Sequence, residues 1–414
     1  MRRDYDNTDY CRRLHALFKP GNGVSPPVLA GRDDELDTLS KRLDLLVCRD
    51  EVASDVVLYG PRGNGKTVLL RELERLAERA GADTLTLRPT QVPSALDLAK
   101  QLLYNDHDAL GGLLDRLTPS ALSVSLPGLT SARWQAMSQS ERAQVNLERL
   151  FPLLAARCRE RPLLVTLDEA HTLDIAVGQH LLNLSELVRG KARAPFLLIL
   201  AGTPGLRDRL GAMNATFWGR ARKLGIGRLT PDATAQALAR PLTDKSVEFD
   251  PDALDAVVED CQGYPYFTQV WGQALCEALV ERRAPRVSLD IVARARPGVD
   301  REREDYYQDR YTEMENNDLL AAALVVGDVC GRANERVDSR TLRAALVAAG
   351  AAPAESVAKA QVRQLAMLGY LWRQPPGVDW EPGIPSLMRY VNEKTARFTP
   401  DEGTGAAPPS GMSP

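Results

Sequence analysis

The chain has no long apolar run and no leader-like N-terminus. None of its hydrophobic stretches approaches the roughly 20 residues that a membrane-spanning helix needs. The first six residues, Met1 to Asp6, lack the apolar core of a secretory signal peptide. These absences exclude a membrane partner at the level of the sequence, and we expect a cytoplasmic protein.

Cysteine, histidine and net charge are also scarce. The six cysteines and four histidines are scattered, and no two cysteines form a C-x-x-C pair, so the sequence predicts neither a zinc site nor a disulfide framework. A net charge of −3 over 414 residues excludes a uniformly basic nucleic-acid coat. Any contact with DNA must therefore come from a local basic patch.

What the chain does contain is a glycine-rich loop of the pattern G-x-x-x-x-G-K-T. The loop and the residue after it are Gly60, Pro61, Arg62, Gly63, Asn64, Gly65, Lys66, Thr67 and Val68. A short apolar run at 55–59 precedes the loop, and leucines at helical spacing follow it over 67–76. Strand, glycine loop and helix are the context that a phosphate-binding P-loop requires, which disfavours a chance match by a glycine turn.

The chemistry of this loop follows from its residue types. Glycines allow a tight backbone whose N–H groups point at phosphate oxygens, and the helix N-terminus adds a positive dipole end. We expect Lys66 to contact the β- and γ-phosphates and Thr67 to ligate magnesium. The motif alone does not separate ATP from GTP, nor hydrolysis from binding.

A second motif lies about 100 residues further along the chain. The apolar strand 163–167 ends in Asp168 and Glu169, the Walker B pattern. We expect Asp168 to hold the magnesium shell and Glu169 to act as general base toward the attacking water. A helix N-cap is the structural alternative for such an aspartate. His171 completes a helicase-like Asp-Glu-Ala-His tetrad, but the remaining chain is too short for a second motor domain, so we interpret His171 as structural or coupling.

Five apolar runs alternate with helical patterns, at 55–59, 84–88, 163–167, 196–201 and 224–229. This alternation predicts an α/β fold, a parallel sheet covered by helices on both faces. Thr203 follows the fourth run, and a basic cluster with Arg220 and Arg222 precedes the fifth.

In this order the motifs resemble those of AAA+ P-loop ATPases of the initiator-like branch, close to the archaeal ATPases grouped with STAND proteins. The resemblance covers about residues 28–290 and implies ATP and Mg²⁺ as cofactors. It implies that Thr203 is sensor 1, touching the γ-phosphate or the lytic water. The pattern Gly-Arg-x-x-Glu-Leu at 31–36 resembles the segment that covers the adenine, although a capped surface helix would look the same.

The same resemblance implies an arginine finger. Arg220 is the first candidate and Arg222 the second, with a solvated basic turn as the alternative. A finger acts on a neighbouring subunit and so implies a homo-oligomer. Where many relatives have a sensor 2 arginine in the helical lid, this chain has none, because Arg282 and Arg283 lie too far along the helix. This departure favours slow hydrolysis and a switch over a motor.

The C-terminal part has its own pattern. A charged helical connector at 301–317 leads to an apolar segment at 319–326, and helices follow at 339–348 and 354–368. With a strand, a turn and a strand over 369–380, this order predicts a winged helix. Residues 331–373 carry seven basic and three acidic residues. Ser356, Lys359 and Arg363 share one face of the third helix, which we interpret as a candidate surface for duplex DNA. The alternative is a winged helix that contacts only a protein partner.

We therefore expect five parts along the chain. These are an N-terminal arm (1–28), an AAA+-like nucleotide-binding domain (29–230), a helical lid (231–298), a winged-helix domain (299–398) and a disordered tail (399–414), with an insertion at 92–135 to which no role is assigned. The expected function is that of a Mg²⁺-dependent ATPase, slow and used as a nucleotide-controlled switch on DNA. Alternatives are a STAND-like signalling or scaffold ATPase, and an ATP-dependent partner of a separate nuclease, transposase or protease.

Overall fold

The computed structural model describes most of the chain. The described residues are 14–15, 17–21, 23–48, 54–103, 139–332, 336–373 and 379–398. The chain divides into two compact units between Arg303 and Glu304. The tail from 399 lies outside the described residues, as does the part of the insertion beyond residue 103.

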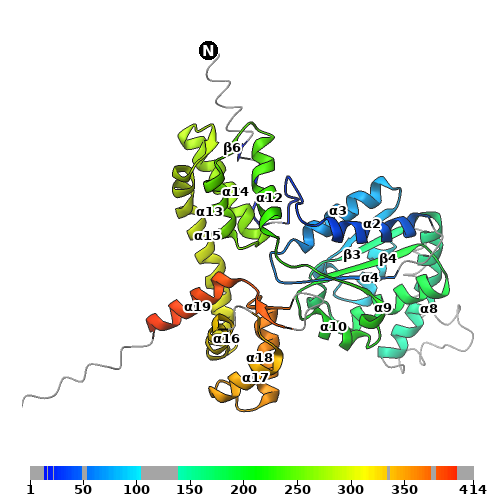
Figure 1. The fold of residues 1–414 in the computed structure, drawn as a ribbon. Coiled ribbons are helices and arrows are strands. Elements are labelled where there is room, and N and C mark those ends of the chain that lie inside the picture. The colour runs from blue at the N-terminus through cyan, green and yellow to red at the C-terminus, as the bar shows by residue number, and fades with distance from the viewer. Residues whose placement is uncertain are drawn as a thin grey trace, which may run out of the picture. The chain divides into compact units, whose positions relative to one another are not determined.

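The first unit is built on a five-stranded parallel sheet (Figure 1). Its strands are β1 (Val56–Tyr59), β2 (Asp83–Leu87), β3 (Leu163–Leu167), β4 (Phe196–Gly202) and β5 (Arg222–Gly225). Their spatial order is β2-β3-β4-β1-β5. The α/β class and the parallel sheet expected from the alternating pattern are confirmed. Because all strands run the same way, their carboxyl ends meet at one edge of the sheet.

Helices cover both faces of this sheet (Figure 1). One face carries α2 (Asp33–Cys48) and α3 (Lys66–Arg79), and the other carries α4 (Ala95–Leu102), α8 (Gln139–Glu160), α9 (Ile175–Glu186) and α10 (Leu206–Met213). The connections include α11 (Phe217–Arg220), the 3₁₀ turns η1 (Pro89–Gln91) and η2 (Ala170–Thr172), and the π-helical segment η3 (Leu187–Lys191). Among the described helices, none is both apolar and long enough to cross a membrane.

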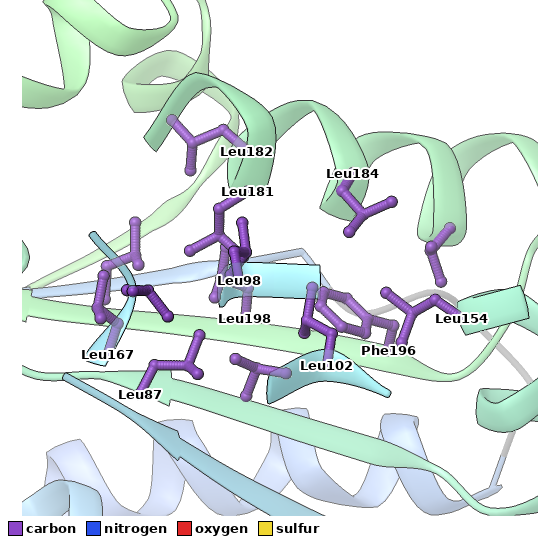
Figure 2. Close-up of a cluster of buried hydrophobic side chains, with 14 of the residues drawn as sticks. Leu87, Leu98, Leu102, Leu154, Leu167, Leu181, Leu182, Leu184, Phe196 and Leu198 are labelled. Atoms are coloured by element: carbon purple, nitrogen blue, oxygen red, sulfur yellow. The ribbon is translucent and has the colours of Figure 1, made fainter. Parts of the chain in front are cut away.

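Two hydrophobic cores lie on opposite faces of the sheet, and alternate residues of each central strand point into one core or the other. Leu164, Leu197 and Ile199 pack on the side of α2 and α3. Phe196 and Leu198 point to the opposite side, among the leucines of α4 and α9 (Figure 2). All seven residues of β4 are buried. A strand buried on both faces has no reason to alternate polar with apolar residues, which explains its continuous hydrophobic run.

The last strand lies earlier than expected. The sequence pattern predicts 224–229, but β5 ends at Gly225. Beyond it, the carbonyl oxygen of Ile226 accepts a hydrogen bond from the Asn64 side chain, at 3.1 Å, and that of Gly227 accepts one from Arg32, at 2.7 Å. The carbonyls of Ile226 and Gly227 thus accept hydrogen bonds from side chains and not from a neighbouring strand. The predicted bounds of this strand, 224–229, were therefore wrong.

Helices after β5 complete the first unit. They are α12 (Pro231–Thr243), α13 (Pro251–Cys261), α14 (Pro265–Arg282) and the first half of α15 (Leu289–Asn316), with a small pair of strands, β6 (Glu248–Phe249) and β7 (Arg286–Val287). Each of α12, α13 and α14 begins at a proline, where the missing N–H costs no helical hydrogen bond. From the N-terminal segment, the buried Phe18 ring packs against Gly272 of α14, in the space that a Cβ would occupy.

The second unit begins with the second half of α15 and continues, in its described residues, with three helices, a hairpin and a closing helix. These are α16 (Leu320–Arg332), α17 (Ser339–Ala348), α18 (Glu355–Met367), the antiparallel strands β8 (Leu371–Trp372) and β9 (Glu381–Pro382), and α19 (Pro385–Phe398). A bridge between Val337 and Trp380 extends the hairpin. The buried Tyr370 hydroxyl donates to the carbonyl of Ala323, at 2.9 Å, which joins the hairpin to α16. This is the order of elements expected of a winged helix, and the turn at 374–378 lies outside the described residues.

Candidate functional site

The sheet order brings the sequence motifs to one place. Strand β4 lies between β1, which precedes the glycine loop, and β3, which precedes Asp168. Tyr59 pairs with Gly202, and Leu167 pairs with Leu200. The loop, Thr203 and the Asp168–Glu169 pair therefore follow three adjacent strand ends.

The glycine loop requires its glycines for two separate reasons. Gly63 and Gly65 have φ angles of 83° and 89°, in the left-handed region that L-residues with a Cβ rarely adopt. At Gly60 the reason is space, because a Cβ there would lie 2.2 Å from the carbonyl oxygen of Ile226. The loop then leads directly into the N-terminus of α3 at Lys66.

Lys66, the first residue of α3, is buried against the loop. Its Nζ donates to the carbonyl oxygens of Gly60, at 2.9 Å, and Pro61, at 2.8 Å. Burial lowers the pKa of Lys66 to about 8, although the carboxylates of Glu169 and Asp168 oppose this shift. A buried ammonium group at a helix N-terminus is an anion-binding arrangement.

Two oxygen ligands converge beside the lysine. The Thr67 hydroxyl donates to Asp168 Oδ2 at a distance of 2.5 Å, joining α3 to the end of β3. Asp168 Oδ1 accepts the backbone N–H of Glu169 at 2.9 Å. A hydroxyl and a carboxylate are hard donors of the kind that Mg²⁺ prefers, so this pair fits the expected metal site.

Glu169 sits on a kinked backbone. Its φ of 51° is unusual for a non-glycine residue. Both the backbone N–H and the hydroxyl of Thr172 donate to the Glu169 carbonyl at 2.9 Å, which holds the kink. Burial, then the neighbouring Asp168 charge, raises the pKa of the Glu169 carboxyl. A carboxylate with a raised pKa is a stronger base than an ordinary one.

Thr203 lies at the end of β4 with a hydroxyl that lacks a partner. The residue is buried, and its Oγ1 has no hydrogen-bond partner among the described residues. Its backbone N–H donates to Nδ1 of His171 at 3.4 Å. A buried hydroxyl without a partner is costly in an ordinary core, and at the end of β4 it is available as a donor to a bound ligand.

The sequence analysis did not predict that Arg32 links the glycine loop to the segment after β5. Buried Arg32 donates to the carbonyl oxygens of Asn64, at 3.1 Å, and Gly227, at 2.7 Å, and pairs with Glu35 at 3.5 Å. Burial lowers the pKa of Arg32, while Glu35 opposes the shift. The motif Gly-Arg-x-x-Glu-Leu was the available signal, but sequence could not show that its arginine holds the glycine loop to the end of β5.

A cavity of about 340 Å³ opens above these groups. Its lining comes from the N-terminal segment (Lys19, Gly21, Gly23, Val24, Pro26, Val28, Leu29, Ala30, Arg32), the loop and α3 (Arg62 to Val68), Glu169, Leu229, Ala237 and the start of α14 (Pro265, Tyr266, Thr268, Gln269). The apolar side chains of the N-terminal segment suit a base, and the loop suits phosphates. Among the described lining residues the arginines are Arg32 and Arg62, and neither belongs to the lid.

Arg220 is the predicted site residue that lies apart from this group. It forms a two-point ion pair with Glu186 of the same chain, and both side chains are nearly half exposed. Arg222 is exposed at the start of the edge strand β5. The structure thus brings together Lys66, Thr67, Asp168, Glu169 and Thr203, but not Arg220.

Comparison with known proteins agrees with this geometry. Residues 28–199 match the family described as AAA ATPase domain. This match identifies residues 28–199 as an AAA ATPase domain. No curated protein matches its sequence. The Walker-type ATPase of Pyrococcus abyssi is similar in structure, with a TM-score of 0.54 and 17% identity over 87% of this chain and 95% of that one.

A second similar structure is the ORC2 protein of Aeropyrum pernix in ADPNP–ADP complexes. Its TM-score is 0.52 at 14% identity, and the match covers 92% of this chain and 100% of that one. At these identities the likeness concerns the fold. The likeness supports the P-loop ATPase fold that the order of motifs predicts.

Proposed function

We propose that this AAA+ protein binds ATP with Mg²⁺ and hydrolyses it slowly, as a nucleotide-controlled switch that acts on duplex DNA. The observation that carries the ATPase part is the contact of Thr67 with Asp168 beside buried Lys66. Residues more than a hundred positions apart supply the oxygen ligands, the cation and, in Glu169, the base.

Each group then has a role that its chemistry allows. Lys66 and the N–H groups of residues 60–68 hold the phosphates, with Val68 in the first turn of α3. Thr67 and Asp168 hold Mg²⁺, which supplies charge neutralisation when bound. Glu169 accepts a proton from the attacking water at its carboxylate, and Thr203 Oγ1 donates to a γ-phosphate oxygen or orients the water.

The lid supports the switch part of the proposal. An arginine from the lid is missing among the described lining residues, so the lid places no cation of its own at the γ-phosphate. It contacts the loop through Tyr264 instead. A lid that contacts the glycine loop but supplies no arginine to the γ-phosphate is consistent with slow hydrolysis and a long-lived ATP-bound state.

The second unit supports the DNA part. Lys359 and Arg363 are exposed on α18, while Leu365 on the opposite face is buried. Ser356 and Ala360 are also exposed on that face. Basic and small side chains on one face of a third helix suit insertion into a major groove. The competing STAND-like function would use the same face for a protein partner.

Steady-state hydrolysis tests the proposal. Wild type and Glu169→Gln are compared with and without duplex DNA. We expect slow turnover that DNA stimulates and that the variant loses while it still binds ATP. Tight ATP binding without turnover or DNA effect would overturn the enzymatic proposal and favour the signalling or scaffold function.

A further inference from the structure

His171 bridges two parts of the site. Its Nε2 lies 3.4 Å from Glu169 Oε2, and its Nδ1 accepts the backbone N–H of Thr203 at 3.4 Å. A backbone N–H can only donate, so Nδ1 must be the unprotonated nitrogen. The ring proton then sits on Nε2 and faces the carboxylate of Glu169.

The ring has a fixed slot in the fold. The His171 side chain is only 10% exposed. Gly202 precedes Thr203, and a Cβ on Gly202 would lie 3.1 Å from Nδ1 of His171, closer than most Cβ contacts. A glycine at the end of β4 therefore lets the imidazole approach the strand, and the turn η2 carries it there from the end of β3.

The imidazole is neutral over the range in which such an enzyme works. Burial, together with the charges of Arg62 and Lys66, lowers the pKa of His171 to about 4. A neutral imidazole donates one hydrogen bond without cancelling the charge of the carboxylate it contacts. Glu169 would keep its basicity, and Oε1 would stay available as an acceptor.

We propose that His171 is a positioning residue for hydrolysis, which orients the Glu169 carboxylate and ties it to the end of β4 at Thr203. This inference rests on the proposed ATPase function. The imidazole of His171 contacts both the backbone N–H of Thr203 and the carboxylate of Glu169. A shift of Thr203 would therefore move the Glu169 carboxylate, which accepts the proton of the attacking water.

The first test is turnover of His171→Leu, which keeps the bulk and removes both hydrogen bonds. We expect kcat to fall on the order of tenfold, as for loss of a hydrogen bond to a charged group, while the Kd for ATP stays within about twofold because no phosphate contact is lost. His171→Gln can still donate to Glu169 and should recover part of the loss. His180→Gln, a half-buried histidine of α9, is the matched control.

Two further comparisons decide whether His171 acts through Glu169. In a Glu169→Gln background, His171→Leu should cause no further loss, because the group that it positions is gone. Normal kcat in His171→Leu, with unchanged melting temperature, would overturn the inference. A wild type without turnover would instead overturn the proposed function.

A second readout does not need turnover. Nitrogen-15 NMR of histidine-labelled protein should show His171 with its proton on Nε2, assigned through the Gln variant. Glu169→Ala should shift the His171 signals and leave those of His180 in place. Unchanged His171 signals would show that the contact is absent and overturn the inference whatever the enzyme does.

Discussion

Tyr264, at the start of the lid helix α14, donates a hydrogen bond to the backbone carbonyl of Arg62 in the glycine loop. Its hydroxyl also fills the space beside Gly63 that a Cβ would occupy. The ring packs on Phe267, with centroids 5.3 Å apart. The lid is therefore attached to the phosphate-binding backbone itself, and nucleotide affinity should depend on this contact.

Removing the hydroxyl tests that dependence. Tyr264→Phe keeps the ring and loses the hydrogen bond, so we expect the Kd for a fluorescent ATP analogue to rise by roughly 2- to 10-fold, as for a neutral hydrogen bond. Tyr264→Ala should weaken binding further because the contact with Phe267 is lost as well. Affinity equal to wild type in Tyr264→Phe would show that the contact does not couple lid and loop.

Asp260 of α13 is a hub of the lid. It accepts hydrogen bonds from Trp271, at 2.8 Å, Arg296, at 3.2 Å, and Arg303. Burial alone would raise its pKa, but the two arginines and Trp271 hold the pKa of this carboxyl below its usual value. Asp260→Asn should lower the free energy of unfolding by about 1–3 kcal/mol, allowing for solvent screening. Asp300→Asn, at an exposed partner of Arg303, is the control and should change it by less than about 0.5 kcal/mol.

The pH dependence of that difference has a definite sign. A depressed folded pKa gives stability that is complete above the unfolded pKa of about 4 and is lost as the pH falls through the folded value. The gap between wild type and Asp260→Asn should be constant from about pH 7 to 5 and shrink below about pH 4. Thermal unfolding across this range measures it, and a gap that widens in acid would contradict the assignment.

Adding one methyl group at Gly60 should reduce both the stability of the fold and the affinity for ATP. Gly60→Ala places a Cβ against the backbone carbonyl of Ile226, which cannot move aside as a flexible side chain would. We expect a loss of about 1–3 kcal/mol in unfolding free energy and at least about tenfold weaker ATP binding, which is a loss of about 1.4 kcal/mol. Gly219→Ala in α11, where no heavy atom lies within 4 Å, is the control and should be neutral or slightly stabilising. Equal effects of the two changes would refute the steric argument.

The proposed DNA face predicts a salt signature. Lys359→Glu with Arg363→Glu should weaken duplex binding by at least about tenfold at low salt and reduce the slope of log K against log salt by about two. Arg282→Glu with Arg283→Glu makes the same charge change on exposed lid residues and should have little effect. If both pairs act alike, the effect is one of net charge, and α18 is not the DNA surface.

Mixing two inactive variants tests whether Arg220 acts on a neighbouring copy. Lys66→Ala cannot hold phosphate but keeps Arg220, whereas Arg220→Ala keeps the complete loop. If the arginine works in trans, their mixture should recover turnover that neither shows alone. Arg220 must leave Glu186 to do so. Hydrolysis by a monomer at the normal rate would exclude a finger that acts in trans, whether from Arg220 or from Arg222.

The parts of the site that the sequence predicts are those with local patterns. The glycine loop lies between its own strand and helix, and β3 covers the same residues, 163–167, as the apolar run before Asp168. Each motif could be placed because the residues that define it are contiguous. The parallel sheet followed from the alternation of such segments.

The residues that sequence reasoning missed act across long separations. Arg32 donates to Gly227 and Tyr264 to Arg62, and no local spacing links either pair. The pairing of Arg220 with Glu186 depends on α9 and α11 lying together in the fold. These contacts exist only after the sheet has formed, so a pattern in the chain cannot contain them.

The position of β1 also decides when the site can form. This strand is made early, but its neighbours β4 and β5 begin at Phe196 and Arg222. β2, the next strand to be synthesised, pairs with β3 instead. A nascent chain that ends before residue 196 therefore holds the whole glycine loop on an unpaired apolar strand. Pairing across such separations is slow, and the exposed strand is prone to aggregation. The carbonyls that accept hydrogen bonds from Asn64 and Arg32 arrive only with residues 226 and 227, so the contacts that hold the loop are completed late.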